Sequence, residues 1–301
     1  MSDARKSSRL GETFERLRAR GERALVAYLT AGDPSLADTG RLVLEAARRG
    51  ADVIELGVPF SDPLADGPVI QRAGMRALDR GTTLPRVLET VATLRAETSV
   101  PIALLTYYNP VLAFGLKAFA RTATDAGVDG VIVADLPPEE AGPLATEAAA
   151  AGLDVVHMVA PTSTPERVRL IARRSRGFIY LVALTGVTGE RRELPRDLAE
   201  QIRTLRRVTT MPICVGFGIS RPEHVEAAGR LADGVIVGSA IVRLIEERAG
   251  SVRLVQDVGE FIAKLKAPLR GTRSGEPGIP ATDRNGEGDP LPAISARTRP
   301  R

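Results

Sequence analysis

The sequence predicts a (β/α)8 barrel, and three observations favour this fold. Short apolar runs rich in β-branched residues recur eight times along the 301-residue chain. They are apolar at odd and even positions alike, which is typical of strands covered on both faces. Segments of helical period, rich in Ala, Leu and Arg, separate them, and this alternation indicates a parallel α/β protein. The expected strands are residues 24–30, 52–57, 101–106, 130–134, 154–159, 178–183, 212–216 and 234–237.

The expected helices follow the strands in order. A further helix at 11–21, with Phe14 and Leu17 on one face, precedes the first strand, and a short helix at 240–247 follows the last. The alternative fold is a doubly wound open sheet, but the Gly-rich first turn of that fold is replaced here by AGDP at 31–34. The other expected helices are residues 36–49, 84–97, 116–126, 139–151, 166–174, 197–207, 222–228 and 251–266.

The boundaries of these elements carry their own signals. Proline marks the first turn of three expected helices, and two of these prolines follow the capping-competent residues Asp33 and Thr164. Glycine followed two residues later by Asp marks three joins from helix to strand, at 50–52, 127–129 and 152–154. We interpret each glycine as a left-handed helix end.

Composition bounds the class of protein. Hydrophobic residues make up 44% of the chain and charged residues 26%, as in a soluble domain. The single cysteine, Cys214, excludes an internal disulfide and favours a cytoplasmic setting. The net charge is only +4, and no basic run is interleaved with aromatic residues, so we expect no nucleic-acid partner. We also expect neither a signal peptide nor a membrane span.

Three parts of the chain are distinguished by composition. Residues 1–8 are expected to be a flexible N-terminus, and residues 9–266 the barrel. Residues 267–301 are rich in Gly and Pro and contain no aromatic residue. Such a segment buries too little surface to offset the entropy of ordering, so it is predicted to be a disordered tail without a catalytic role.

Two carboxylates at the end of the second strand are the strongest site candidates. Glu55 interrupts an apolar strand between Ile54 and Leu56, and Asp66 lies in the Pro- and Gly-rich loop that follows. A buried carboxylate is costly unless it is paired or functional, and two in one loop can divide acid and base roles. The alternative is that Glu55 is a satisfied core residue and Asp66 an ordinary turn residue.

Glycine-rich turns after three consecutive strands indicate a phosphate site. They lie at 186–189, 216–218 and 238–239, and the last opens a helix with Ser239. Backbone N–H groups at such turns approach an anion closely, and barrels often bind phosphate after strands seven and eight. A flat apolar pocket is suggested by strand-end residues, although these also fit ordinary barrel core: Tyr28, Leu105, Tyr107, Met158, Tyr180 and Phe217.

The remaining candidates favour structural roles. His157 and His224 lack partners at metal-ligand spacing, so no metal site is expected. We interpret His157 as a strand residue, His224 as a surface residue of a helix, and Cys214 as core rather than nucleophile.

With these motifs in place, residues 9–266 resemble the tryptophan synthase alpha subunit family. The motif ELGVPFSDPLADGPVIQ at 55–71 is highly specific for that family. Shorter matches are LTAGDP at 29–34, YYNP at 107–110, GVTG at 186–189, GFGIS at 216–220 and GSAIV at 238–242. The resemblance implies a lyase that performs the retro-aldol cleavage of indole-3-glycerol phosphate to indole and glyceraldehyde 3-phosphate, late in tryptophan biosynthesis.

The resemblance also implies roles for individual residues. Glu55 matches the general acid/base, Asp66 the carboxylate that engages the indole N–H, and Tyr180 the tyrosine beside them. The phosphate site matches Gly189, Gly218, Gly238 and Ser239. The indole pocket matches Tyr28, Leu105, Tyr107, Ile132, Ala134, Met158, Thr188, Phe217 and Ile236.

A partner is implied as well. The family has no metal or cofactor in this subunit; pyridoxal phosphate belongs to the beta subunit, in an αββα tetramer. Asp62 and Pro63, in the 60–66 loop, and Pro137 resemble the surface that faces the beta subunit. One departure is Ala183-Leu184, where some members have Ser-Arg. The alternative function is a regulatory subunit that activates a beta subunit and has little activity alone.

Overall fold

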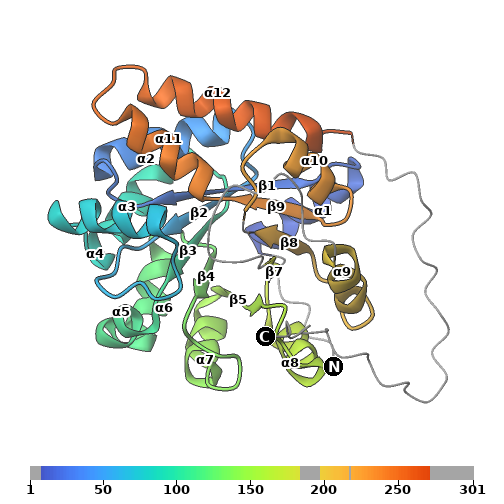
Figure 1. Cartoon of the computed structure of the whole chain (residues 1–301). Coiled ribbons are helices and arrows are strands. Elements are labelled where there is room, and N and C mark those ends of the chain that lie inside the picture. Colours follow the sequence, from blue (N-terminus) through green and yellow to red (C-terminus); the bar gives the residue numbers. More distant parts are fainter. Residues whose placement is uncertain (1–7, 184–196, 217, 272–301) are drawn as a thin grey trace, which may run out of the picture.

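The fold is a parallel β-barrel surrounded by helices (Figure 1), as the sequence predicts. The computed structural model describes residues 8–183, 197–216 and 218–271. The strands pair in the order β5-β4-β3-β2-β1-β9-β8-β7-β6. Only His157 separates β5 from β6, and these are the two halves of one predicted strand. One half pairs with β4 and the other with β7, so the ring closes through His157.

The strand bounds agree closely with the expected runs. They are β1 (Ala24–Thr30), β2 (Val53–Gly57), β3 (Ile102–Thr106), β4 (Gly130–Val133), β5 (Asp154–Val156), β6 (Met158–Val159), β7 (Ile179–Val182), β8 (Ile213–Gly216) and β9 (Gly234–Val237).

The helices run around the outside of the barrel (Figure 1). They are α1 (Arg9–Ala19), α2 (Leu36–Arg48), α3 (Pro68–Asp79), α4 (Leu84–Leu94), α5 (Tyr108–Phe114), α6 (Leu116–Asp125), α7 (Gly142–Ala151), α8 (Pro165–Arg174), α9 (Leu198–Arg206), α10 (Pro222–Gly229), α11 (Ser239–Arg248), α12 (Leu254–Lys266) and the 3₁₀-helix η1 (Ala267–Leu269).

Several helix predictions need correction. The sequence did not predict α3 or α5, because both lie in Pro-rich loop motifs; α3 begins directly after the Gly67 cap, with Pro68 as its first residue. Pro34 does not open α2, because Ser35 is the cap and its side chain accepts a hydrogen bond from the Asp38 N–H. The capping prediction at Thr164 is confirmed.

The folded part of the chain also extends past the predicted boundary at residue 266. The helix η1 lies within the segment assigned to the tail, and Leu269 is fully buried there. Its carbonyl accepts a hydrogen bond from the Arg23 N–H (3.0 Å), directly before β1. The burial of Leu269 is not evident from the sequence, because the segment as a whole is rich in Gly and Pro.

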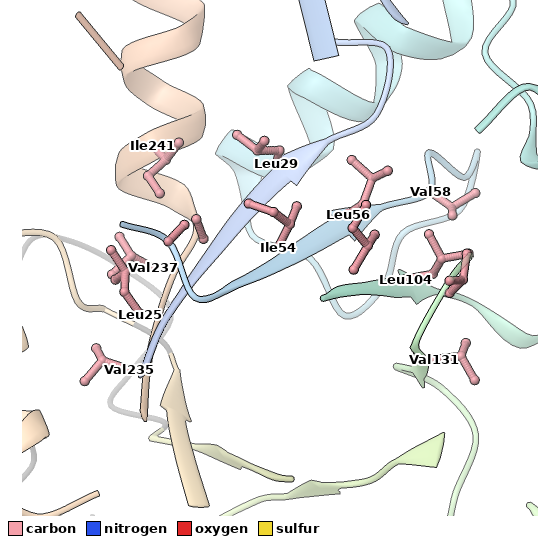
Figure 2. Packing of buried hydrophobic residues seen from close by; sticks show 14 of the residues in the cluster. Leu25, Leu29, Ile54, Leu56, Val58, Leu104, Val131, Val235, Val237 and Ile241 are labelled. Atoms are coloured by element: carbon pink, nitrogen blue, oxygen red, sulfur yellow. The ribbon is translucent and has the colours of Figure 1, made fainter. Parts of the chain in front are cut away.

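Two apolar layers explain why the strands are apolar at both parities. The outer layer lies between strands and helices; Figure 2 shows Leu25, Ile54, Leu104 and Val235, all fully buried, among its members. The inner layer fills the barrel, and α1 contributes to it Leu10, Phe14 and Leu17. The Phe14 and Phe178 rings lie 5.8 Å apart. Helix α1 therefore covers the end of the barrel at which the strands begin, and the opposite end remains for a site.

Aspartates tie together the N-terminal ends of the strands. Asp52, Asp129 and Asp233 each accept a hydrogen bond from an N–H at the start of a neighbouring strand, at 2.7–2.8 Å. Each is also paired with a cation: Lys266, Arg95 and Arg206 respectively. The joins predicted at 50–52 and 127–129 are thus structural features, because they stabilise the end of the barrel that carries no site.

Glycines make room for two tyrosines inside the barrel. A Cβ atom placed on Gly57 would lie 2.1 Å from the Tyr28 hydroxyl oxygen, and one on Gly216 would lie 2.6 Å from that of Tyr180. Both tyrosines are buried. Small residues on β2 and β8 therefore let bulky rings from β1 and β7 extend across the upper barrel.

We predict that Gly57→Ala lowers the free energy of unfolding by about 1–3 kcal/mol, because the added methyl overpacks the Tyr28 ring. Urea unfolding monitored by circular dichroism measures this. The matched control is Gly74→Ala in α3, where a Cβ meets nothing within 4 Å. There, alanine should raise stability by about 0.5–1 kcal/mol, since it favours helix. Equal effects of the two substitutions would contradict the packing argument.

Candidate active site

A single cavity collects most of the predicted site residues at the C-terminal ends of the strands. Its volume is about 500 Å³, within the range of small-molecule sites. Glu55 and Asp66 come from β2 and the loop after it, whereas the turns at Gly218 and Gly238 follow β8 and β9. The cavity therefore has an acidic, apolar end and an end built from backbone turns.

Glu55 lies on β2 with its side chain turned into the barrel. It is 1% exposed, and its strand register places it between Tyr28 of β1 and Ala103 of β3. Its Oε2 atom has no hydrogen-bond partner among the described residues. Burial, with a further contribution from the Asp66 charge, raises the pKa of Glu55 to about 8. The carboxyl group is therefore protonated at neutral pH and has a proton to donate to a molecule in the cavity.

Asp66 is the second carboxyl group of the cavity and lies in the loop between β2 and α3. Burial raises its pKa to about 6, and the nearby Tyr107 hydroxyl opposes this shift. Asp66 therefore loses its proton before Glu55, and its charge then holds the proton on Glu55. At neutral pH the pair consists of one carboxylate and one carboxylic acid, the division of roles that acid–base chemistry requires.

The loop that carries Asp66 is held from two sides. From α3, the Gln71 Nε2 atom donates hydrogen bonds to the carbonyl oxygens of Asp66 (2.9 Å) and Pro63 (3.4 Å). From the end of β3, the Tyr107 hydroxyl accepts a hydrogen bond from the Ala65 N–H (3.0 Å). The Phe60 and Tyr107 rings lie 5.2 Å apart. These contacts fix the position of Asp66 relative to the strand that carries Glu55.

Two tyrosines complete the acidic end. Tyr28 and Tyr180 both line the cavity and are about 5% exposed. Burial is the main cause that raises the pKa of both hydroxyls above the ordinary value, and the Glu55 charge adds to it. The hydroxyls therefore stay neutral and can donate hydrogen bonds.

The opposite end of the cavity is suited to an anion. Helix α11 begins at Ser239, so its free backbone N–H groups and partial positive charge face this end. Gly218 has a left-handed backbone conformation (φ +74°) in the neighbouring turn. Arg221 and Arg243 line the same part of the cavity. Backbone donors and guanidinium groups together are the usual recognition elements for phosphate.

The structure places the remaining predicted site residues in three groups. Tyr28, Leu105, Ala134, Met158 and Ile236 line the cavity beside the catalytic candidates. Ile132 does not: it is fully buried in the inner layer below the cavity, because it lies two residues before Ala134 on the same face of β4. Tyr107 lies behind the loop and supports Asp66. Thr188, Gly189 and Phe217, with the predicted turn at 186–189, lie outside the described residues.

Several residues that line or support the cavity were not predicted from the sequence. Arg243 follows Ser239 by one helical turn, so i, i+4 spacing from the predicted phosphate turn was an available signal. Arg221 directly follows the GFGIS turn. No local signal identifies Phe261, which reaches the cavity from α12. Gln71 ends the central motif and had no assigned role, yet it holds the Asp66 loop.

The two histidines are both buried. Burial lowers the pKa of His157 to about 4, so it is neutral. His224 was expected on a helix surface, but it is only 7% exposed on α10, so that prediction is wrong. Across the described ranges, no group of three or more His, Cys, Asp or Glu is placed to hold a metal ion. Nor does any helix in those ranges have the length and apolar character to cross a membrane.

Comparison with known proteins gives one consistent result. Residues 14–269 match the family model described as tryptophan synthase alpha chain. The chain is 49% identical over 267 residues to the tryptophan synthase alpha chain of Geobacter sp. (strain M21), covering 88% of this chain and all of the relative. It is 50% identical over 259 residues to that of Solibacter usitatus, covering 86% and 97%.

Solved structures agree with the sequence comparison. A structure of Mycobacterium tuberculosis tryptophan synthase superposes with a TM-score of 0.81 at 36% identity, covering 88% of this chain and 99% of that one. A tryptophan synthase complex from Pyrococcus furiosus superposes with a TM-score of 0.75 at 37% identity, covering 81% and 98%.

We predict that the burial of Glu55 makes stability depend on pH. Its pKa is about 8 when folded and 4.5 ordinarily, so the folded state binds the proton more tightly. The free energy of unfolding should fall as the pH rises from about 4.5 through 8, and Glu55→Gln should remove this loss. The stability advantage of Glu55→Gln over wild type should grow by at most about 1.4 kcal/mol per pH unit. Urea unfolding at several pH values measures it, and a constant difference would contradict the assignment.

Proposed function

Because the chain belongs to the tryptophan synthase alpha chain family, and is a lyase that cleaves indole-3-glycerol phosphate, we propose that Glu55 and Asp66 divide the chemistry of that cleavage. The observation that carries the proposal is the buried Glu55 carboxyl, in the same cavity as the more acidic Asp66; within the described part of the chain its Oε2 atom has no hydrogen-bond partner. Such a pair supplies an acid and an anion without a metal or cofactor.

In the first step, Glu55 donates its proton to C3 of the indole ring. The ring then carries a positive charge centred on its nitrogen. Asp66, ionised at neutral pH because its pKa is about 6, accepts the hydrogen bond of the indole N–H and stabilises that charge. The apolar wall of Leu105, Met158 and Ile236 gives the ring a flat surface to lie against.

In the second step, the Glu55 carboxylate takes the proton from the glycerol hydroxyl next to the ring. The bond between C3 and the glycerol carbon breaks, its electron pair returns to the ring, and an aldehyde forms. One proton is given and one is taken, so Glu55 ends in its starting state. The neutral hydroxyls of Tyr28 and Tyr180 border this reaction and exclude bulk water from the acidic end.

The phosphate lies at the opposite end of the cavity in this proposal. The N-terminus of α11, with Gly238 and Ser239, and the turn at Gly218 supply backbone and hydroxyl donors. Gly189 and the other residues of its turn are proposed to complete the site, although they lie outside the described residues. Binding at this end holds the substrate so that C3 lies at Glu55.

We further propose a beta-subunit partner in an αββα tetramer, with pyridoxal phosphate held by the beta subunit, and a cytoplasmic location. The proposed interface includes Asp62, Pro63 and Pro137. Leu64 in the same loop is 85% exposed, and Leu112 on α5 is 53% exposed. Exposed large apolar residues of this kind suit a protein interface.

Hydrogen bonds join the segments of this surface to one another and to the site. The loop containing Asp62 and Leu64 is bound to Tyr107 through the Ala65 N–H. The next residue, Tyr108, donates its N–H to the Asp135 Oδ1 atom at 2.7 Å, two residues before Pro137. A partner that contacts this surface would therefore contact the loop that carries Asp66, and could change the position of that carboxylate.

We predict that Glu55→Gln lowers kcat for indole release from indole-3-glycerol phosphate by about 10²–10⁴-fold, because glutamine cannot transfer the proton. Asp66→Asn should lower it as well. For wild type, kcat/KM should be bell-shaped in pH, with limbs near 6 and 8 that reflect Asp66 and Glu55. Asp66→Asn should lose the acidic limb. Wild-type activity in Glu55→Gln would overturn the mechanism, and activity only with beta subunit present would favour a mainly regulatory role.

We predict that Leu64→Glu weakens binding to the tryptophan synthase beta chain of the same organism by about tenfold or more. The substitution removes a leucine that the partner would bury and places a charge in the interface. Titration calorimetry with the purified chains measures this. The control is Val252→Glu, at a fully exposed position between α11 and α12. Unchanged binding by Leu64→Glu would show that this loop lies outside the interface.

A further inference from the structure

Four charged side chains form an ion-pair cluster outside the cavity. The Arg76 guanidinium of α3 binds the Asp33 carboxylate through two hydrogen bonds of 2.9 and 2.8 Å. The Arg76 Nη1 atom also donates to the Glu246 Oε1 atom of α11, at 2.7 Å. Arg72, one turn before Arg76, binds both oxygens of Glu246 at 3.1 and 3.0 Å. We refer to Asp33, Arg72, Arg76 and Glu246 as the α3 clamp.

The clamp is partly buried and geometrically specific. The Asp33 side chain is only 2% exposed, so it depends on Arg76 for compensation of its charge. Arg72 and Arg76 are four residues apart on one helix and would repel each other without Glu246 between them. Two-point arginine–carboxylate contacts fix orientation as well as distance. The clamp therefore sets how α3 lies against α11 and against the loop after β1.

Each element joined by the clamp carries one wall of the cavity. Strand β1 ends three residues before Asp33 and carries Tyr28. Helix α3 begins two residues after Asp66 and holds its loop through Gln71. Helix α11 begins at Ser239, at the anion end. A shift of α3 relative to α11 would change the distance between the two ends of the cavity.

We propose that the α3 clamp is a positioning device that sets the spacing between the Asp66 end and the Ser239 end of the cavity, matching it to a substrate that occupies both ends. This inference rests on the proposed function, since it assumes a substrate with an indole at one end and a phosphate at the other. None of the four clamp residues lines the cavity as the structure describes it. They act through α3 and α11.

A positioning role and a purely stabilising role predict different changes in ligand affinity when the clamp is disturbed. A ligand that occupies one end senses only that end. A ligand that spans the cavity gains affinity from both ends only when their spacing fits. Disturbing the clamp should therefore weaken two-ended ligands selectively, whereas general loss of stability should affect one-ended and two-ended ligands alike.

The test compares Arg76→Met, Arg76→Lys and Glu246→Gln with wild type in the full chain. Calorimetry measures the affinity of three probes: indole, inorganic phosphate, and indole-3-propanol phosphate, a non-cleavable molecule with both ends. Steady-state assays measure indole release. The control is Arg248→Met, which breaks the 2.8 Å ion pair of Arg248 with Asp257, between the same helix α11 and α12, and leaves α3 untouched.

We expect Arg76→Met to weaken the two-ended probe and to lower kcat/KM by about 10–100-fold, with indole and phosphate affinities within about twofold of wild type. Arg76→Lys should recover only part of the loss, because an ammonium cannot make the two-point contact. Glu246→Gln, at a half-buried position, should show the same selectivity if Arg76→Met does not fold. The control should behave as wild type.

Two results would overturn the inference. One is equal weakening of all three probes, and the other is unchanged binding of the two-ended probe in folded Arg76→Met and Glu246→Gln. The wild-type assay separates this failure from that of the proposed function. If wild type releases no indole, the proposed function fails; if it does and the clamp variants match it, only the clamp proposal fails.

Discussion

The candidate site depends on one physical constraint, the burial of an ionisable carboxyl group, one of whose oxygens finds no hydrogen-bond partner in the ranges that the structure describes. Glu55 lies where the barrel interior meets the cavity, and desolvation there raises its pKa to about 8. A carboxylate in such a place would be costly, so the group keeps its proton at neutral pH. The proton that Glu55 retains at neutral pH is therefore a direct consequence of its burial within β2.

The rest of the upper barrel is arranged around this group. Tyr28 and Tyr180 extend across the barrel and line the same cavity as Glu55, and they fit because Gly57 and Gly216 leave them room. Asp66 is more accessible to water and ionises first, which keeps the proton on Glu55. At the other end of the barrel, the buried or partly buried carboxylates have partners. Asp52, Asp129 and Asp233 each accept a hydrogen bond from a strand N–H and pair with a cation. At the cavity end, by contrast, the Oε2 atom of the buried Glu55 has no hydrogen-bond partner among the described residues, and this difference distinguishes the two ends of the barrel.

Much of this could be predicted from the sequence, for identifiable reasons. Strands buried on both faces leave a continuous apolar signal, so their positions were predicted correctly. Glu55 was visible because it interrupts such a signal. Helix α3 was not predicted, because its Gly67 cap and its first residue, Pro68, belong to a Pro- and Gly-rich loop motif. The burial of Leu269 and His224 could not be predicted either, since it depends on neighbours distant in sequence. Ile132 has the right parity for the pocket, yet it is fully buried and does not line the cavity as the structure describes it.

The α3 clamp shows why the last step from residues to site geometry requires the structure. Arg76 follows Asp33 by more than forty residues, and Glu246 follows Arg76 by well over a hundred. In the sequence, each of the three is indistinguishable from an ordinary surface charge. Together they join the three segments that carry Tyr28, Asp66 and Ser239. The barrel strands fix Glu55 rigidly, but Asp66 lies on a loop, and loop residues need support to hold catalytic geometry. Gln71 and Tyr107 hold the loop to α3 and β3, and the clamp holds α3 to the rest of the barrel. The position of Asp66 is therefore set by a chain of contacts that begins outside the cavity.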